Sequence, residues 1–175
     1  MDSPARRTYR QRISSSSVWP NQVSPTIHSA PWSLLPMFKR IPGLNTLGVS
    51  MSRIDYAPGG LNPPHTHPRA TEMVFVLEGQ LDVGFITTAN VLISKTIKVG
   101  ETFVFPKGLV HFQKNNGQVP AAVIAAFNSQ LPGTQSIAAT LFSAQPPVPD
   151  HVLTMAFQVG TKEVRKIKSR FAPKK

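Results

Sequence analysis

Residues 59–79 read GGLNPPHTHPRATEMVFVLEG, a segment that holds two histidines and a glutamate among turn-forming and β-forming residues. His65 and His67 are two positions apart, so on a strand their side chains point to the same face. The intervening residues 68–71 permit a turn or a bulge before Glu72 begins the next strand. Both imidazoles and the carboxylate can therefore aim at one point, which is the spacing that a metal-chelating group needs.

A second block, residues 100–115, reads GETFVFPKGLVHFQKN and adds a third imidazole, that of His111, on a strand after a Pro-x-Gly turn. The chain has no cysteine, so any metal must be held by nitrogen and oxygen ligands. Three imidazoles and one carboxylate leave positions open on an ion that prefers five or six ligands, which is typical of a reactive site. Such a set suits Mn, Fe, Co, Ni, Cu or Zn, and ligand type alone does not choose among them.

Short β-rich runs separated by Gly, Pro and Asn surround these blocks and predict a closed or double-sheet β structure. The predicted strands are Val49–Tyr56, Glu72–Leu77, Gln80–Ile86, Thr102–Phe105, Val110–Gln113 and Ala121–Phe127. After Pro132 the apolar period becomes helical. The predicted helices are Thr134–Phe142, Asp150–Gln158 and Thr161–Phe171. The sequence thus predicts a mainly β domain followed by a helical segment.

The last predicted helix is amphipathic, because Val164, Ile167 and Phe171 lie on one face and Lys and Arg residues lie on the other. We expect the apolar face to pack against its own domain or a neighbouring subunit rather than to bind a membrane. Apolar runs such as 73–77 and 119–127 are far shorter than the roughly 18 to 20 residues that cross a bilayer. No membrane partner is therefore expected.

The net charge of +11 is concentrated at the two ends of the 175-residue chain. Residues 1–44 carry six Lys and Arg against Asp2, and residues 161–175 carry seven against Glu163, whereas residues 45–160 carry six basic and six acidic side chains. A nucleic-acid-binding protein needs basic side chains on the element that contacts the phosphates. The neutral middle segment argues against nucleic-acid binding.

Residues 1–40 are rich in Ser, Pro and Arg and show no helical or strand period, so we expect a disordered or poorly ordered tail. Their acid-poor composition is similar to an organelle transit peptide, but no apolar run in them predicts a secretory signal. We expect three parts, namely this tail over 1–40, a β-barrel over 41–132, and a helical arm with a basic tail over 133–175.

The two blocks resemble the two boxes that define the cupin superfamily in its germin form. The first box, G-x5-H-x-H-x4-E-x6-G, matches residues 59–79, and the second, G-x5-P-x-G-x2-H-x3-N, matches residues 100–115. The likeness extends from about residue 41 to residue 159. It implies a jelly-roll β-barrel with a C-terminal helical arm. It also implies one Mn(II) per chain, with no catalytic group beyond the metal site formed by His65, His67, Glu72 and His111.

The resemblance also implies where such a protein works and how it assembles. The resemblance implies a protein that is secreted into the plant apoplast and serves plant defence. It also implies a hexamer, built as a trimer of dimers, that is held together through the C-terminal helices. Residues 1–40 match neither the signal peptide nor the disulfide-bonded segment of germins, and the chain has no Asn-x-Ser/Thr sequon. We therefore expect an atypical or truncated N-terminal segment and a homo-oligomer weakened by the loss of N-terminal dimer strands.

Two activities follow from the resemblance, superoxide dismutation and oxalate oxidation, both on a small-molecule substrate. Oxalate-oxidising germins use two asparagines beside the metal, of which Asn62 matches one, whereas Ser52 stands at the position of the other. This difference favours a superoxide dismutase-like activity over oxalate oxidation. The alternative is a non-catalytic cupin that serves as a storage protein or as a small-ligand receptor module. Storage cupins usually lack metal ligands, and all four are present here.

Overall fold

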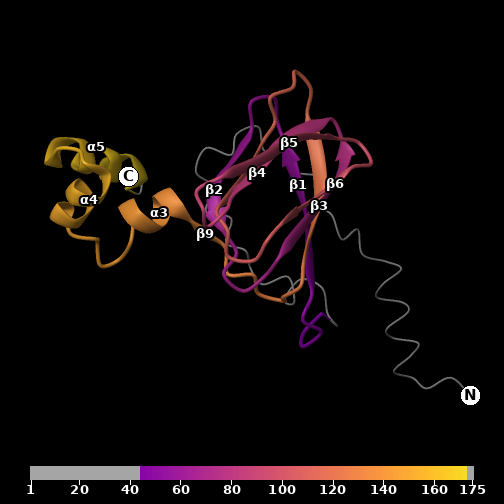
Figure 1. Ribbon diagram of the computed structural model, residues 1–175, viewed down its shortest axis with the longest axis horizontal. Helices are drawn as coiled ribbons and strands as arrows, with labels where there is room; N and C mark the ends of the chain where they lie inside the picture. The colour runs from indigo at the N-terminus through magenta and orange to yellow at the C-terminus, as the bar shows by residue number, and fades with distance from the viewer. Residues whose placement is uncertain (1–43, 173–175) are drawn as a thin grey trace, which may run out of the picture.

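The computed structural model describes residues 44–172, so the expectations for residues 1–40 lie outside the described part of the chain. The strands are β1 (Ser50–Tyr56), β2 (Leu61–Thr66), β3 (Glu72–Glu78), β4 (Gln80–Ile86), β5 (Leu92–Lys98), β6 (Thr102–Phe105), β7 (His111–Lys114), β8 (Ala121–Phe127) and β9 (Gln135–Ser136). They form two antiparallel sheets, in the orders β1-β8-β3-β6 and β5-β4-β7-β2-β9, which curve face to face into a barrel (Figure 1). The domain boundaries at residues 40 and 132 stay predictions.

The pleat of β3 shows how the sequence sorts side chains between the core and the surface. Val74 and Val76 are completely buried, whereas Met73 and Phe75 are 48% and 42% exposed on the outer face. Because alternate residues of a strand share a face, Glu72 points into the barrel together with the two valines. The interior that these residues enter also contains Tyr56, Leu81, Val83, Ile97, Phe105, Val123, Ala125 and Phe127.

The mainly β fold with C-terminal helices is confirmed, and the differences from the predicted elements are local. The predicted strands included neither residues 61–66, which form β2, nor residues 92–98, where β5 forms the edge of the five-stranded sheet and pairs only with β4. All of its side chains except Ile97 are exposed, so its sequence has no regular apolar alternation. A helix was predicted over 134–142, but Gln135 and Ser136 form the short strand β9 and the helix begins only at Ile137.

The C-terminal arm consists of α3 (Ile137–Phe142), α4 (Asp150–Phe157) and α5 (Thr161–Phe171), and it extends away from the barrel (Figure 1). Leu153 and Val164 are buried between its helices. The ring of Phe142 lies 5.4 Å from that of Phe157 and 6.4 Å from that of Phe171, measured between ring centroids. The apolar face predicted for the last helix therefore packs within the arm itself.

Two further features of the arm bear on its stability and its surface. Asp150 accepts hydrogen bonds from Lys168 at 2.7 Å and Arg165 at 2.9 Å, and these contacts hold the pKa of its carboxyl below the usual value. On the side of α4 away from Asp150, Val152 and Met155 are 44% and 78% exposed. They lie three residues apart and so share one face of the helix, which we call the α4 stripe. Within residues 44–172 no helix is both long and apolar enough to span a bilayer.

Candidate metal centre

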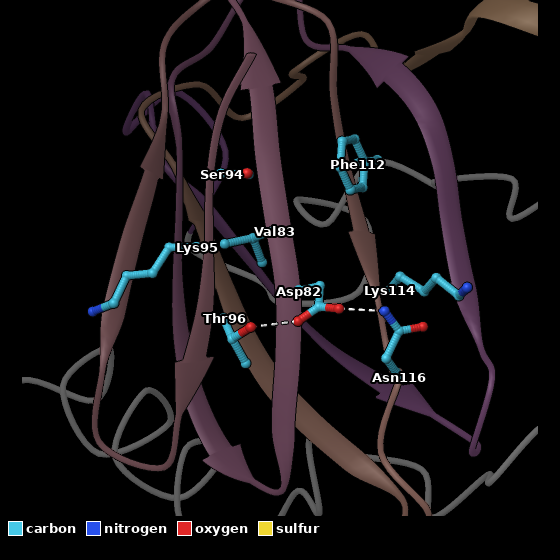
Figure 2. A pocket seen from close by; sticks show the side chains of 8 residues that line it. All are labelled: Asp82, Val83, Ser94, Lys95, Thr96, Phe112, Lys114 and Asn116. Atoms are coloured by element: carbon cyan, nitrogen blue, oxygen red, sulfur yellow. Dashed lines mark hydrogen bonds between the residues drawn. The ribbon is translucent and has the colours of Figure 1, made fainter.

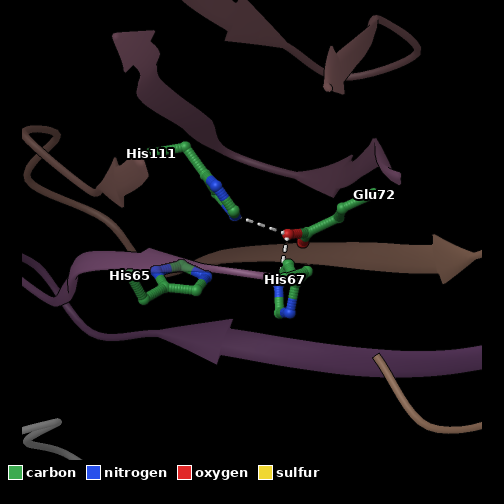
Figure 3. Close-up of side chains that lie close together, drawn as sticks. All are labelled: His65, His67, Glu72 and His111. Carbon is green, nitrogen blue, oxygen red and sulfur yellow. Dashed lines mark hydrogen bonds and ion pairs between the residues drawn. The ribbon is translucent and has the colours of Figure 1, made fainter. Parts of the chain in front are cut away.

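The structure brings the four predicted ligands to one point inside the barrel (Figure 3). His65 lies on β2, His67 directly follows it, Glu72 begins β3, and His111 begins β7. One potential ligand atom from each residue lies within 4.8 Å of all the others. All four side chains are buried, with at most 4% of any residue exposed. The four ligands therefore form a compact group although they are widely spaced along the chain.

Strand pairing explains why these residues meet. His65 on β2 pairs directly with His111 on β7. The register of this strand pair shifts between Asn62 and His65. Glu72 pairs on one side with Phe105 of β6 and on the other side with Phe127 of β8. Because β3 belongs to one sheet and β2 and β7 to the other, the ligands face each other across the barrel interior.

Glu72 is the centre of the group. Its Oε2 lies 3.0 Å from Nε2 of His67 and 3.0 Å from Nε2 of His111. The ring centroid of His65 lies 4.2 Å from that of His111, so the third imidazole completes the cluster beside this pair. Nitrogen and carboxylate oxygen atoms thus converge with the composition that divalent first-row metals accept.

The hydrogen bonds of two histidines fix which ring nitrogen carries the proton. Nδ1 of His65 donates to the carbonyl oxygen of Pro63, and Nδ1 of His111 donates to that of Leu109, both at 2.8 Å. Since a carbonyl can only accept, Nδ1 is protonated in each ring, which leaves Nε2 as the nitrogen that can bind a metal. In His111 this nitrogen points at the carboxylate of Glu72, 3.0 Å away. The donor set therefore fits a metal ion.

The protonation states also suit metal binding. Burial alone raises the pKa of the Glu72 carboxyl, but the hydrogen bonds and charges of His111 and His67 outweigh it and lower the pKa to about 2. Burial, together with the neighbouring His111, lowers the pKa of His65 to about 4. At neutral pH Glu72 is ionised and His65 is neutral, which are the forms in which these side chains bind metals.

A hydrogen-bonded group behind Glu72 holds its other oxygen. Gln113 Nε2 donates to Glu72 Oε1 at 3.1 Å, and Gln113 Oε1 accepts from the Tyr56 hydroxyl at 3.0 Å and from the Asn62 amide at 2.6 Å. Burial and the charge of Glu72 raise the pKa of Tyr56 well above its usual value, so its phenol stays a donor. The amide of Gln113 is thereby held in one orientation, and Oε2 of Glu72 is left for the metal.

The two residues predicted to lie near a substrate occupy different positions. Asn62 lies on β2 and its amide is engaged by Gln113. Ser52 lies on β1 opposite the buried Ala125, and it shares the inward face of that strand with Ile54 and Tyr56. The structure therefore directs Ser52 into the barrel but gives it no direct bond to the metal ligands.

Sequence reasoning missed several residues around the centre. Gln113 is two positions after His111 on the same strand, so the pleat alone could have placed it inside. Phe105 stacks on the imidazole of His111 at a centroid distance of 4.5 Å, and Phe127 meets that of His67 edge-on at 4.9 Å. These rings form apolar walls beside two ligands. Thr134, whose hydroxyl lies 3.0 Å from Nδ1 of His67, carried no local sequence signal.

A hollow of about 440 Å³ lies on the outer face of the five-stranded sheet (Figure 2). Phe112 and Lys114 line it from β7, where they alternate with the inward-facing His111 and Gln113. Both carboxylate oxygens of Asp82 accept hydrogen bonds from within the chain, one from Thr96 at 2.6 Å and one from Asn116. The hollow is separated from the metal ligands by the sheet, and we assign it no role in their chemistry.

Comparison with known proteins agrees with this geometry. The sequence profile of the family described as Cupin matches residues 38–165. Over 137 residues the chain is 84% identical to a rhicadhesin receptor of Pisum sativum and 81% identical to germin-like protein 5-1 of Oryza sativa subsp. japonica. The chain is a germin-like member of the cupin family.

The germin-like assignment extends to three-dimensional structure. A recombinant oxalate oxidase solved in complex with glycolate superposes with a TM-score of 0.75 at 50% identity, over 77% of this chain and 69% of that one. The matched region is 78% of this chain in both curated relatives, but only 63% of the pea protein and 62% of the rice protein. The chain thus covers less than two thirds of the length of these germin-like relatives.

Proposed function

We propose that this germin-like cupin binds one Mn(II) per chain through His65, His67, Glu72 and His111. The observation that supports this most directly is the convergence of four buried ligand atoms that all lie within 4.8 Å of one another. The pKa values of Glu72 and His65 further support a preformed ligand group. Manganese is chosen from the metals that suit these donors because of the likeness to germins.

We propose a superoxide dismutase-like activity for this centre. In that reaction two superoxide ions and two protons give one dioxygen and one hydrogen peroxide, and a bound manganese supplies the required change between two oxidation states. The four ligands hold the ion and leave coordination positions open. Phe105 and Phe127 shield two of the imidazoles, and Gln113 keeps Glu72 turned toward the centre.

Oxalate oxidation is the less favoured reaction, although a solved relative at 50% identity is an oxalate oxidase. A dicarboxylate needs donors beside the metal in addition to an open position. Ser52 offers one hydroxyl where germins that oxidise oxalate carry an asparagine amide, and a hydroxyl has a shorter reach.

The test is to measure metal content and both activities on one manganese-loaded sample. We expect about one Mn(II) per chain, superoxide dismutation and little oxalate turnover, with Ser52→Asn as the variant that gains the missing donor. His111→Ala should bind far less metal. Equal metal content in wild type and His111→Ala would contradict the ligand assignment, and robust oxalate turnover by the unaltered chain would contradict the choice of reaction.

A receptor role is the second candidate, because the pea relative at 84% identity is named a rhicadhesin receptor. In that case the barrel is a binding module and the metal is structural. Full manganese occupancy without either activity would favour this alternative. A storage role is less favoured, because all four ligands are present.

We also propose that the protein is extracellular, acts in plant defence and assembles into a homo-oligomer, with the trimer of dimers of germins as the template. The exposed α4 stripe supports assembly, since Val152 and Met155 place apolar side chains in water on one face of the helix. The neutral charge of residues 45–160 supports a small-molecule substrate rather than a nucleic acid.

A further inference from the structure

The three histidines of the metal centre are oriented in two different ways. His65 and His111 each donate Nδ1–H to a backbone carbonyl two residues earlier, that of Pro63 and that of Leu109. Their orientation is therefore set by their own segments of chain. Nδ1 of His67 instead lies 3.0 Å from the hydroxyl of Thr134, which is 67 positions further along the chain. Of the three partners, this one alone is a side chain that substitution can remove.

Thr134 belongs to the short segment that joins the barrel to the arm, and this segment is clamped against the loop that follows His67. The Arg69 side chain donates through Nε to the carbonyl of Leu131 at 2.7 Å, and its backbone N–H donates to that of Pro132 at 3.1 Å. Gly133 adopts φ of +76°, and a Cβ there would lie 2.5 Å from the Arg69 guanidinium. A residue with a side chain would therefore be strained by the positive φ and would have to push the Arg69 guanidinium aside.

Beyond Thr134 the clamp continues as β9. Gln135 pairs with Thr66 and Ser136 pairs with His65, so the segment adds a short strand beside the ligand-bearing β2. Helix α3 begins at the next residue, Ile137. The root of the arm is thus built onto the same strand that carries His65 and leads into His67.

The chemistry of a hydroxyl suits this place. When Nε2 of His67 presents its lone pair to a metal, Nδ1 carries the proton and the Thr134 oxygen accepts it as a hydrogen bond. Such outer partners fix the ring orientation and the tautomer of a ligating histidine, and their removal typically weakens metal binding about 10- to 100-fold. An aliphatic side chain of the same shape can do neither.

We infer that Thr134 is the positioning residue for His67, and that through it the root of the helical arm sets the orientation of one metal ligand. The inference rests on the proposed binding of Mn(II). It gives the arm a part in the metal centre, since any displacement of residues 131–136 moves the partner of His67.

The direct test compares Thr134→Val, which removes the hydroxyl and keeps the shape, with Thr134→Ser, which keeps the hydroxyl. Thr140→Val is the matched control, because Thr140 lies on α3, beyond the residues that pair with β2. Mn(II) affinity is measured from the electron paramagnetic resonance signal of the free ion. We expect about tenfold weaker binding for Thr134→Val and changes within about twofold for the other two. The fine structure of the bound Mn(II) signal should change in Thr134→Val alone.

Gly133→Ala provides an independent variant, because it keeps the hydroxyl but strains the backbone next to Thr134 and disturbs the Arg69 side chain that clamps the segment. We expect it to weaken Mn(II) binding as well. Far-ultraviolet circular dichroism of each variant shows whether the fold is retained. Normal affinity in a folded Gly133→Ala protein would contradict the role of the arm root.

Nitrogen-15 NMR of His67 in the metal-free protein separates this inference from the proposed function. Removal of the Thr134 hydroxyl should shift the Nδ1 resonance of His67 and leave that of His65 in place. Unchanged His67 resonances with unchanged affinity in Thr134→Val would overturn the inference, as would failure of Thr134→Ser to preserve both. If the wild type bound no Mn(II), the proposed function would fail, and the His67 resonance would still decide whether Thr134 orients the ring.

Discussion

The barrel and the arm bury their apolar side chains to very different degrees. Between the two sheets, Val74, Val76, Leu81, Val83 and Ile97 are completely removed from solvent by residues of the same chain. In the arm only Leu153 and Val164 are buried among the described helical residues, and Met155 is 78% exposed. The barrel therefore has a completely buried apolar core, whereas the arm buries few side chains and leaves the α4 stripe in solvent.

Helix length adds to this contrast. The helices α3, α4 and α5 contain 6, 8 and 11 residues, and isolated helices shorter than about 12 to 15 residues are marginal in water. Their stability must come from packing, of which the arm has little within one chain. The comparison teaches that the barrel is the stable part of the molecule and that the arm is the part whose stability depends on contacts with a neighbour.

The largest expected effect is in the barrel, at Phe105. Phe105→Ala removes a completely buried ring that stacks on His111, so we expect a loss of about 3 to 5 kcal/mol in the free energy of unfolding and weaker metal binding. Urea unfolding followed by circular dichroism measures the change. The matched control is Val104→Ala on the exposed face of the same strand, which should cost less than about 1 kcal/mol. Equal losses in the two variants would show that the barrel interior is not the main source of stability.

A smaller and more local effect is expected in the arm. Leu153→Ala should cost about 2 to 3 kcal/mol, because the leucine is the most buried side chain of α4, but the loss should be confined to the arm. Hydrogen exchange should show faster exchange over residues 137–171 and unchanged protection in β3 and β8. Val152→Ala, an exposed neighbour, serves as control. Loss of protection that spreads into the central strands would mean that arm and barrel unfold as one unit.

The smallest effect on the folded chain is expected at Met155. Met155→Lys places a charge on the exposed α4 stripe, so the free energy of unfolding of a single chain should change by less than about 0.5 kcal/mol. The proposed oligomer, by contrast, should dissociate, because a charge would be buried at its interface. Sedimentation at several concentrations measures this, with Met155→Leu as the variant that keeps the assembly. An unchanged sedimentation profile for Met155→Lys would move the interface elsewhere.

Much of the centre was predictable because its geometry is local. The two-residue spacing of His65 and His67 and the position of Glu72 at the start of a strand bring their side chains to the same region of the barrel. The pairing of His65 with His111 across β2 and β7 needed the second block and its turn. Metal identity stayed open in this reasoning from residues, and the choice of manganese came from the resemblance.

The features that were missed depend on distant parts of the chain. Strand β5 has only Ile97 inside, and its pairing with β4 rather than its own pattern makes it a strand. Gln135 and Ser136 read as the start of a helix, but β2 offers them hydrogen bonds before the helix can begin. Arg69 holds the residues just before Thr134 close to His67. Thr134 and His67 are 67 positions apart, so no local sequence pattern predicts their contact.

The division of the metal ligands between the two sheets has a mechanical consequence. Glu72 belongs to one sheet and His111 to the other, and 39 positions of chain separate them. An ion bound to both ties the sheets together as a disulfide would, in a protein that contains no cysteine. Closing a loop of that length with a cross-link lowers the entropy of the unfolded chain by an amount worth about 4 kcal/mol at 25 °C. If the proposed ion is bound, the barrel should unfold more slowly with the ion than without it.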